Sequence, residues 1–322
     1  MIQGARKIVN MCAGVKAQEK VLIVTDPERR RVADALAVAV HEVGARPVVT
    51  SMLPNQLDGE EPAELVRAAM LDADVVFAPV TRSISHSRAV KDVLEAGGRV
   101  LSLAKFDDRQ LIVGGINADF EHEKPRCDAI ADVFTAAKRV HLTTPGGTDL
   151  TADISGRPGN SHPCIARNPG EFTAIINIEA NVAPVEGTAE GVIIVDGSVS
   201  NFDIGPVKTP IELTVEKGAI TSIKGGPEAK LIDRILRELG SKEAYNIAQI
   251  AVGLNPECTD FNGWFLNEHG VYGSAHIGIG TSQNLGGDLR APLHFDVMMR
   301  SPKLMADDTL IAESHEIHIP YP

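Results

Sequence analysis

The first 140 residues alternate between short apolar runs and stretches of helical length, and this alternation constrains the fold more than any other feature. Apolar runs occupy residues 20–26, 46–52, 74–80 and 99–104. Between the first two runs, apolar residues from Val32 to Val43 recur every three or four positions, which is the spacing of one helix face. Strands that alternate with helices in this way form parallel sheets covered on both faces. We therefore predict a small doubly wound parallel-sheet α/β domain over residues 1–140.

The pattern changes from residue 139 onward. Strands and turns are predicted over residues 140–157, 172–184, 191–199 and 211–226, with clusters of Gly, Pro and Asp between them. Helices are predicted only over residues 128–138 and 228–239, and the part after residue 254 is rich in loops. The second half therefore predicts a β-rich α+β domain over residues 141–322.

Several classes of function are disfavoured by the composition. The chain has 43 acidic against 31 basic residues, so it lacks the excess of cations that nucleic acid or an anionic membrane requires. No apolar run approaches the roughly 20 residues that span a bilayer, and the N-terminus does not resemble a secretory signal. The four cysteines lie far apart and form no C-x-x-C pair, so we expect reduced thiols and a cytoplasmic protein. No glycine-rich phosphate-binding motif follows the predicted strands, which favours a scaffold role for the first domain.

The sharpest local motif is Leu-His-Phe-Asp-Val at residues 293–297. On a strand, His294 and Asp296 project from the same face while their apolar neighbours face the core. An imidazole beside a carboxylate suits a divalent transition metal, and it equally suits a hydrogen-bonded pair on a solvated face.

Two further positions could complete such a site. His276 shares a predicted strand face with Gly278 and Gly280, which would leave room for a ligand, although a histidine here could also be a core residue. Glu179 lies in an otherwise apolar or small run, where a buried carboxylate would need a partner or a cation. In a solvated strand it would need neither.

At these segments the chain resembles the thermophilic metallo-aminopeptidases of the aminopeptidase T and S type, and their relatives the 2,5-dihydroxypyridine dioxygenases. The resemblance rests on four motifs in order: TPGGTDLTADISGR, IEANVAPVEGTAEG, HIGIG and LHFDVM. It implies Glu179, His276, His294 and Asp296 as metal ligands. In a hydrolase, Glu179 would be the general base if it is not a ligand. It also implies a homodimer, because the resembled enzymes pair through large surfaces.

Two positions depart from the aminopeptidase pattern. The second glutamate of that family would fall on Gln249, and its catalytic tyrosine would fall on Gln283. We expect both glutamines to contact the substrate. In the dioxygenases the first iron-binding histidine would lie near Gln249, so that His276 would have to complete the set in this chain.

Three functions follow from these observations. The first is a hydrolase of a small amide or related C–N bond, in which one divalent metal such as Zn activates water. The second is a mononuclear non-haem Fe(II) dioxygenase acting on a hydroxylated heteroaromatic ring, and the third is a non-catalytic member that binds a small ligand. Mn or Co could replace Zn in the first. The sequence favours the hydrolase, with a small-molecule substrate.

Overall fold

The computed structural model describes residues 1–322 except 57 and 86, and these residues form two compact units. The first unit comprises Met1–His122, His162–Asn177 and Trp264–Leu266, and the second comprises Glu123–Ser161, Ile178–Gly263 and Asn267–Pro322. The predicted boundary at residue 140 stays a prediction. The contact-based division starts the second unit at residue 123 and assigns two later segments to the first.

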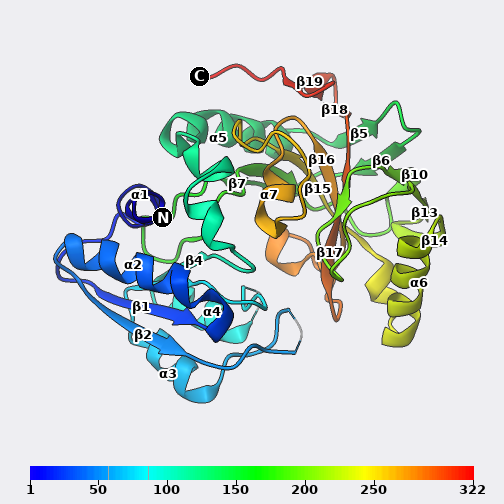
Figure 1. Ribbon diagram of the computed structural model, residues 1–322. Coiled ribbons are helices and arrows are strands. Elements are labelled where there is room, and N and C mark those ends of the chain that lie inside the picture. The colour runs from blue at the N-terminus through cyan, green and yellow to red at the C-terminus, as the bar shows by residue number, and fades with distance from the viewer. Residues whose placement is uncertain (57, 86) are drawn as a thin grey trace. The chain divides into compact units, whose positions relative to one another are not determined.

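A parallel sheet with the strand order β2-β1-β3-β4-β8 forms the centre of the first unit (Figure 1). Its strands are β1 (Lys20–Thr25), β2 (Arg46–Ser51), β3 (Val75–Ala78), β4 (Arg99–Ser102) and β8 (Phe172–Ala174). Its helices are α1 (Ile2–Lys7), α2 (Arg30–Glu42), α3 (Glu64–Leu71) and α4 (Arg88–Glu95). Helix α2 packs on β1, β2 and α1, whereas α3 and α4 pack on each other, and α2 and α3 lie on opposite faces of the sheet. The predicted doubly wound arrangement is confirmed.

The carboxyl end of β1 has a structural role. Asp26 is fully buried and accepts hydrogen bonds from the backbone N–H groups of Glu28 and Arg29, which begin the chain's path into α2. It also accepts from the backbone N–H and the hydroxyl of Thr81, beyond the end of β3. These contacts occupy the carboxylate with local groups, and the scaffold role of this domain stays a prediction.

Strand β8 differs from the sequence-based expectation. The segment of residues 172–184, which is predicted to belong to the β-rich second half, forms β8 in the parallel sheet and β9 (Glu179–Val182) in a different sheet. Ile176 between them has φ of 69°, and a left-handed residue breaks the strand geometry. The break sends the chain from one unit to the other.

Two largely antiparallel sheets make up the second unit. One has the order β14-β13-β10-β6-β5-β18-β19-β20, and the other has the order β12-β11-β17-β16-β15-β9-β7. The strands of the first are β5 (Arg139–Thr143), β6 (Asp149–Asp153), β10 (Glu190–Val195), β13 (Ile211–Glu216), β14 (Ala219–Lys224), β18 (Lys303–Ala306), β19 (Thr309–Glu313) and β20 (Glu316–Ile317). Those of the second, besides β9, are β7 (Gly159–His162), β11 (Ser198–Val199), β12 (Gly205–Pro206), β15 (Ile247–Gly253), β16 (Ala275–Gly280) and β17 (His294–Met299). The predicted β-rich second half is confirmed.

Among the described residues, three further α-helices follow the first domain's helices, and two of them differ from the sequence prediction. They are α5 (Phe120–Ala136), α6 (Pro227–Leu239) and α7 (Phe265–Gly270). Helix α5 begins eight residues before the predicted start, where the Asp119 carboxylate accepts from the backbone N–H of His122, and Pro125 lies within the helix. Helix α7 lies in the part predicted as loops. In the described part of the chain, no helix combines the length and the apolar character needed to cross a membrane.

Candidate functional site

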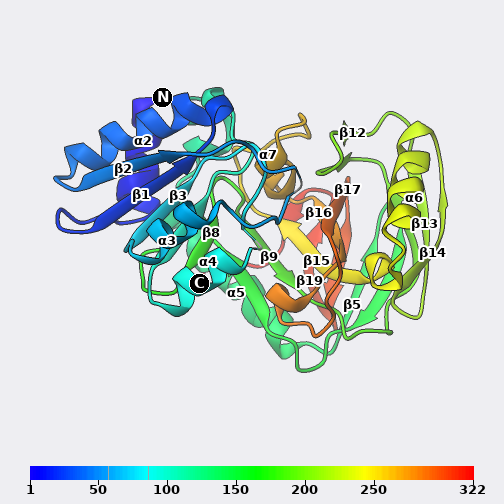
Figure 2. The same cartoon turned by 90° about the horizontal axis from the view of Figure 1, so that it is seen from below.

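Strands β15, β16 and β17 are neighbours in one sheet (Figure 2). One face of these strands carries the polar residues of the candidate site. On β16, Gly278 lies opposite Gln249 of β15 and Asp296 of β17, and Gly280 lies opposite His294. Residues two apart on a strand share a face, so His276 lies on the same face as these groups. The other face of β16 and β17 is apolar and fully buried, through Ile277, Ile279, Phe295 and Val297. The alternation predicted from the sequence is therefore present.

Asp296 is the centre of a first cluster with two histidines. Its Oδ2 lies 3.1 Å from Nε2 of His269, and its Oδ1 lies 3.3 Å from Nε2 of His294. The side chains of Asp296 and His269 are each 8 % exposed and that of His294 is 12 % exposed. Two imidazole nitrogens thus face the two oxygens of one buried carboxylate.

A backbone carbonyl fixes the orientation of His294. Nδ1 of His294 lies 2.9 Å from the carbonyl oxygen of Thr281. Because a carbonyl can only accept, Nδ1 carries the proton of this hydrogen bond. In a neutral ring Nε2 then presents its lone pair, and Asp296 is the group that it faces.

Two acceptors that face each other need a proton or a cation between them. Oδ1 of Asp296 is buried, and in the part of the chain that the structure describes its one polar neighbour is Nε2 of His294, 3.3 Å away. Burial raises the pKa of the Asp296 carboxyl, but the charges and hydrogen bonds of His294 and His269 lower it by more, so it lies well below its usual range. Burial lowers the pKa of His294, and the Asp296 carboxylate outweighs this and raises it. The ionised carboxylate beside imidazole nitrogens is a donor set that suits a divalent transition metal.

His269 comes from α7, whose end is tied to the end of β15. The backbone N–H of Asn255 donates to the carbonyl of Gly270, at 3.0 Å. A Cβ on Gly253 would lie 2.8 Å from the carbonyl oxygen of His269, so glycine at this position permits the close approach. The neighbouring Glu268 is 1 % exposed, and its Oε1 accepts from the backbone N–H groups of residues 262 and 263. Burial raises the pKa of Glu268.

A second cluster surrounds Glu179. Its Oε1 accepts from the amide groups of Asn181, at 2.7 Å, and Gln249, at 2.9 Å. Its Oε2 lies 3.3 Å from Nε2 of His276, and the Gln249 amide nitrogen lies 3.4 Å from the same ring nitrogen. Two amides and an imidazole therefore surround this buried carboxylate.

The two clusters are adjacent. The rings of His269 and His276 meet edge to face, with centroids 5.3 Å apart and planes at 88°. On the strand between them, a Cβ at Gly278 would lie 2.7 Å from Cβ of Gln249 and 2.7 Å from Cε1 of His294. Because position 278 is a glycine, the side chains of Gln249 and His294 can both lie against the backbone of β16.

The structure therefore brings Glu179, His276, His294 and Asp296 to one sheet face, as two pairs rather than as four donors around one point. Among the described residues, no three His, Cys, Asp or Glu side chains already converge as a metal site. The four-ligand set stays a prediction, as does substrate contact by Gln249 and Gln283. Gln249 is engaged with Glu179, and Gln283 is exposed on a short helical turn.

The sequence reasoning missed His269. No spacing rule relates it to Asp296, which lies 27 positions away. The one sequence feature that pointed to His269 is that five of the ten histidines, His269 among them, lie in the last 54 residues.

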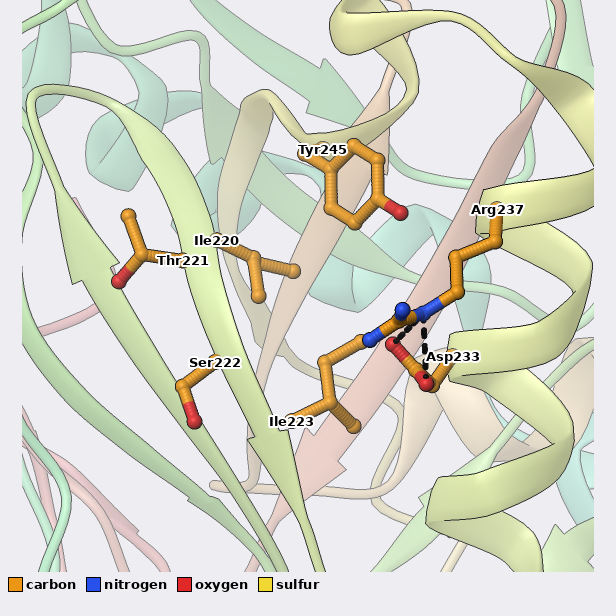
Figure 3. A pocket seen from close by; sticks show the side chains of 7 residues that line it. All are labelled: Ile220, Thr221, Ser222, Ile223, Asp233, Arg237 and Tyr245. Carbon is orange, nitrogen blue, oxygen red and sulfur yellow. Dashed lines mark hydrogen bonds and ion pairs between the residues drawn. The ribbon is translucent and has the colours of Figure 1, made fainter.

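A cavity of about 370 Å³ lies elsewhere in the second unit, between β14 and α6 (Figure 3). Its lining residues include none from the two clusters. Arg237 of this cavity is already paired with the Asp233 carboxylate, at 2.9 Å from both oxygens. We therefore place the candidate chemistry on the sheet face.

The fold and the buried histidine–carboxylate face define an α/β enzyme, and comparison with known proteins gives its family. The chain belongs to the 2,5-dihydroxypyridine 5,6-dioxygenase (NicX) family, whose profile matches residues 1–318. It is 25% identical over 256 residues to the 2,5-dihydroxypyridine 5,6-dioxygenase of Pseudomonas putida KT2440, covering 74% of this chain and 70% of that protein. This confirms the dioxygenase side of the resemblance seen in the sequence.

Solved structures agree on the fold. The structure of 2,5-dihydroxypyridine dioxygenase from Pseudomonas putida KT2440 matches with a TM-score of 0.87 at 20% identity, over 99% of this chain and 97% of that chain. Wild-type AmpT from Thermus thermophilus matches with a TM-score of 0.71 at 13% identity, over 99% and 98% of the two chains. At these identities the likeness is one of fold.

Proposed function

We propose that the protein is a mononuclear non-haem iron dioxygenase that opens a hydroxylated nitrogen heteroaromatic ring. In this proposal His269, His294 and Asp296 hold the iron. The observation that carries it is the pair of imidazole nitrogens that face the two oxygens of the buried Asp296 carboxylate. Two histidines and one carboxylate are the facial set of non-haem Fe(II) oxygenases. Membership of the dioxygenase family supports the same reaction class.

The reaction balances without a further reductant. Ring opening breaks one bond between ring carbons, and both atoms of O₂ enter the product. The ring is oxidised and supplies the four electrons that reduce O₂. Ferrous iron held by His269, His294 and Asp296 would supply the activation of dioxygen.

The chain's own residues hold this arrangement. The Thr281 carbonyl fixes the His294 tautomer, so that Nε2 faces inward. The His276 ring packs against the ring of His269 and limits its rotation. Hydrogen bonds from Asn181 and Gln249 hold the Glu179 carboxylate beside His276. Burial of His269, His276 and Asp296 limits the access of bulk water to this face.

The hydrolase expected from the sequence has weaker support. AmpT shares the fold with this chain, but a likeness at 13% identity extends no further than the fold. The amide of Gln249 contacts Glu179 at the position where the aminopeptidase pattern would have a second glutamate. An amide N–H is a poor substitute for a carboxylate beside a cation.

Oxygen uptake tests the proposal. The metal-free protein is loaded anaerobically with Fe(II), mixed with 2,5-dihydroxypyridine as the probe, and followed with an oxygen electrode and by mass spectrometry. We expect one O₂ consumed per ring opened and both ¹⁸O atoms of labelled O₂ in the product. Protein loaded with Zn(II) should be inactive in this assay, because zinc has no redox chemistry.

The same preparations are tested with amino-acid p-nitroanilides. Turnover of these amides with Zn or Co, together with no oxygen uptake on hydroxylated pyridines with iron, would favour the hydrolase instead.

A further inference from the structure

The segment between β16 and β17 connects the two clusters. Residues 281–293 leave β16 and return to β17, with a short helical turn at Gln283–Leu285. The first of these residues, Thr281, provides the carbonyl that binds Nδ1 of His294. We call residues 281–289 the 281–289 loop. The position of this loop decides where the carbonyl lies.

An ion pair anchors the 281–289 loop. Arg157 pairs with Glu186, and its guanidinium also donates to the carbonyl of Gly286 at 2.8 Å. Oε1 of Glu186 accepts from the hydroxyl of Ser282 at 3.0 Å and from the backbone N–H groups of Asp288 at 2.8 Å and Leu289 at 3.3 Å. Both ends of the loop are therefore bound by the same carboxylate.

The anchor residues flank two neighbouring strands, β7 and β9, and β9 carries Glu179 of the second cluster. Arg157 lies two residues before β7, and Glu186 lies four residues after β9, which begins with Glu179. Asn160 of β7 donates from its side-chain amide to the carbonyl of Leu285 at 3.0 Å and to the side-chain oxygen of Asn181 of β9 at 2.9 Å. The loop is thus tied to the Glu179 side of the site as well as to His294.

The fit around the anchor is tight. A Cβ on Gly287 would lie 2.2 Å from the Ser282 hydroxyl and 2.9 Å from Oε1 of Glu186. Gly286 has φ of +89°, and a Cβ there would lie 2.5 Å from Cγ of Pro158. The Arg157 side chain is only 11 % exposed and that of Glu186 is 25 % exposed. Such a partly buried, multiply bonded pair can fix a loop where an exposed pair contributes little.

We propose that Arg157 and Glu186 are positioning residues: they fix the 281–289 loop so that the Thr281 carbonyl holds His294 in the Nδ1–H form, with Nε2 directed at Asp296. The step to metal binding rests on the proposed function, since it takes His294 as a ligand. The step to the tautomer does not, because it concerns the metal-free protein. In the contacts that the structure describes, Arg157 and Glu186 bind the loop and Thr281 binds the His294 ring, so the effect passes through the loop backbone.

The test is the ring state of His294 in Glu186→Gln, which keeps the size of the side chain and removes its charge. In metal-free protein labelled with ¹⁵N-histidine, at alkaline pH, the wild type should show His294 as a single Nδ1–H tautomer. Glu186→Gln should show a mixture of the two tautomers. Anaerobic Fe(II) titration should show the iron affinity falling by roughly 10–100-fold, the range for losing an outer-shell partner.

Two controls separate positioning from general damage. Glu212→Gln breaks the exposed Lys224–Glu212 pair on β13 and β14, at 2.8 Å, and should leave the His294 signals unchanged. Arg157→Gln should also give a mixture of tautomers, because it removes the bonds of the guanidinium to Glu186 and to the Gly286 carbonyl. Arg157→Lys serves as a milder variant in case the others fold poorly. It retains the positive charge, and it should show mostly the single Nδ1–H tautomer.

An unchanged His294 tautomer in folded Glu186→Gln would overturn the proposal. If the tautomer shifts as expected but the wild type binds no iron, the proposed function fails and the positioning role stands. If the wild type binds iron and all the variants bind it with the same affinity, Arg157 and Glu186 have no role in the metal site.

Discussion

Replacing Asp296 with asparagine is expected to abolish iron retention and ring opening. The Asp296 carboxylate faces Nε2 of His269 and of His294, and it is the sole anionic group of this cluster in the described structure. Asparagine keeps the shape but replaces one oxygen with an N–H donor, which repels a cation. We expect kcat/KM in the oxygen-uptake assay to fall by more than the roughly 100-fold that marks loss of an outer-shell partner. Iron per chain, measured after gel filtration, should fall in parallel.

The chain offers a matched control for this variant. Asp149 of β6 forms an imidazole–carboxylate pair with His141 of β5, at 2.8 Å, and both side chains are exposed. Asp149→Asn removes the same kind of contact where solvent is accessible, and such pairs contribute about 0–1 kcal/mol. It should retain iron and activity. Asp296→Asn protein with full iron content and wild-type turnover would exclude the proposed centre.

Gly278→Ala is expected to reduce both the stability of the protein and its iron affinity, because the added methyl group overlaps with side chains of both clusters. The added methyl group would lie 2.7 Å from Cβ of Gln249 and 2.8 Å from Nε2 of His294, and the Gln249 contact involves an atom next to the backbone. Overpacking of this kind costs about 1–3 kcal/mol in the free energy of unfolding. Because His294 must move to make room, iron affinity should fall as well. Urea denaturation and anaerobic iron titration measure the two effects separately.

Gly226→Ala is the comparison for the backbone change. The atom nearest to a Cβ added at Gly226 would be Cβ of Thr209, at 3.2 Å, and this position lies outside both clusters. This variant should keep the iron affinity of the wild type. Wild-type stability and affinity in Gly278→Ala would show that the space at this position is not needed by the two side chains.

The sequence was informative where structure depends on local periodicity. The two-residue repeat of a strand placed His294 with Asp296, and His276 with Gly278, on one face, because the core must cover the alternate residues. The same reasoning identified the parallel sheet from its alternating helices.

Other features depend on contacts between distant segments. The run of residues 172–184 divides between two sheets at Ile176, and a single left-handed residue has no signature in an apolar run. His269 reaches Asp296 from a helix of six residues, and nothing in its neighbourhood in the sequence predicts that contact. The sequence also did not predict which groups surround Glu179, and the structure shows two amides and an imidazole around it.

The most direct test of the account compares His269→Gln with His276→Gln by iron content per chain after anaerobic loading and gel filtration. His269 faces Asp296, whereas His276 faces Glu179 and Gln249. The account predicts that His269→Gln loses its iron and that His276→Gln keeps close to one iron per chain. Loss of iron from His276→Gln with full retention in His269→Gln would contradict it, and would instead support the set of Glu179, His276, His294 and Asp296.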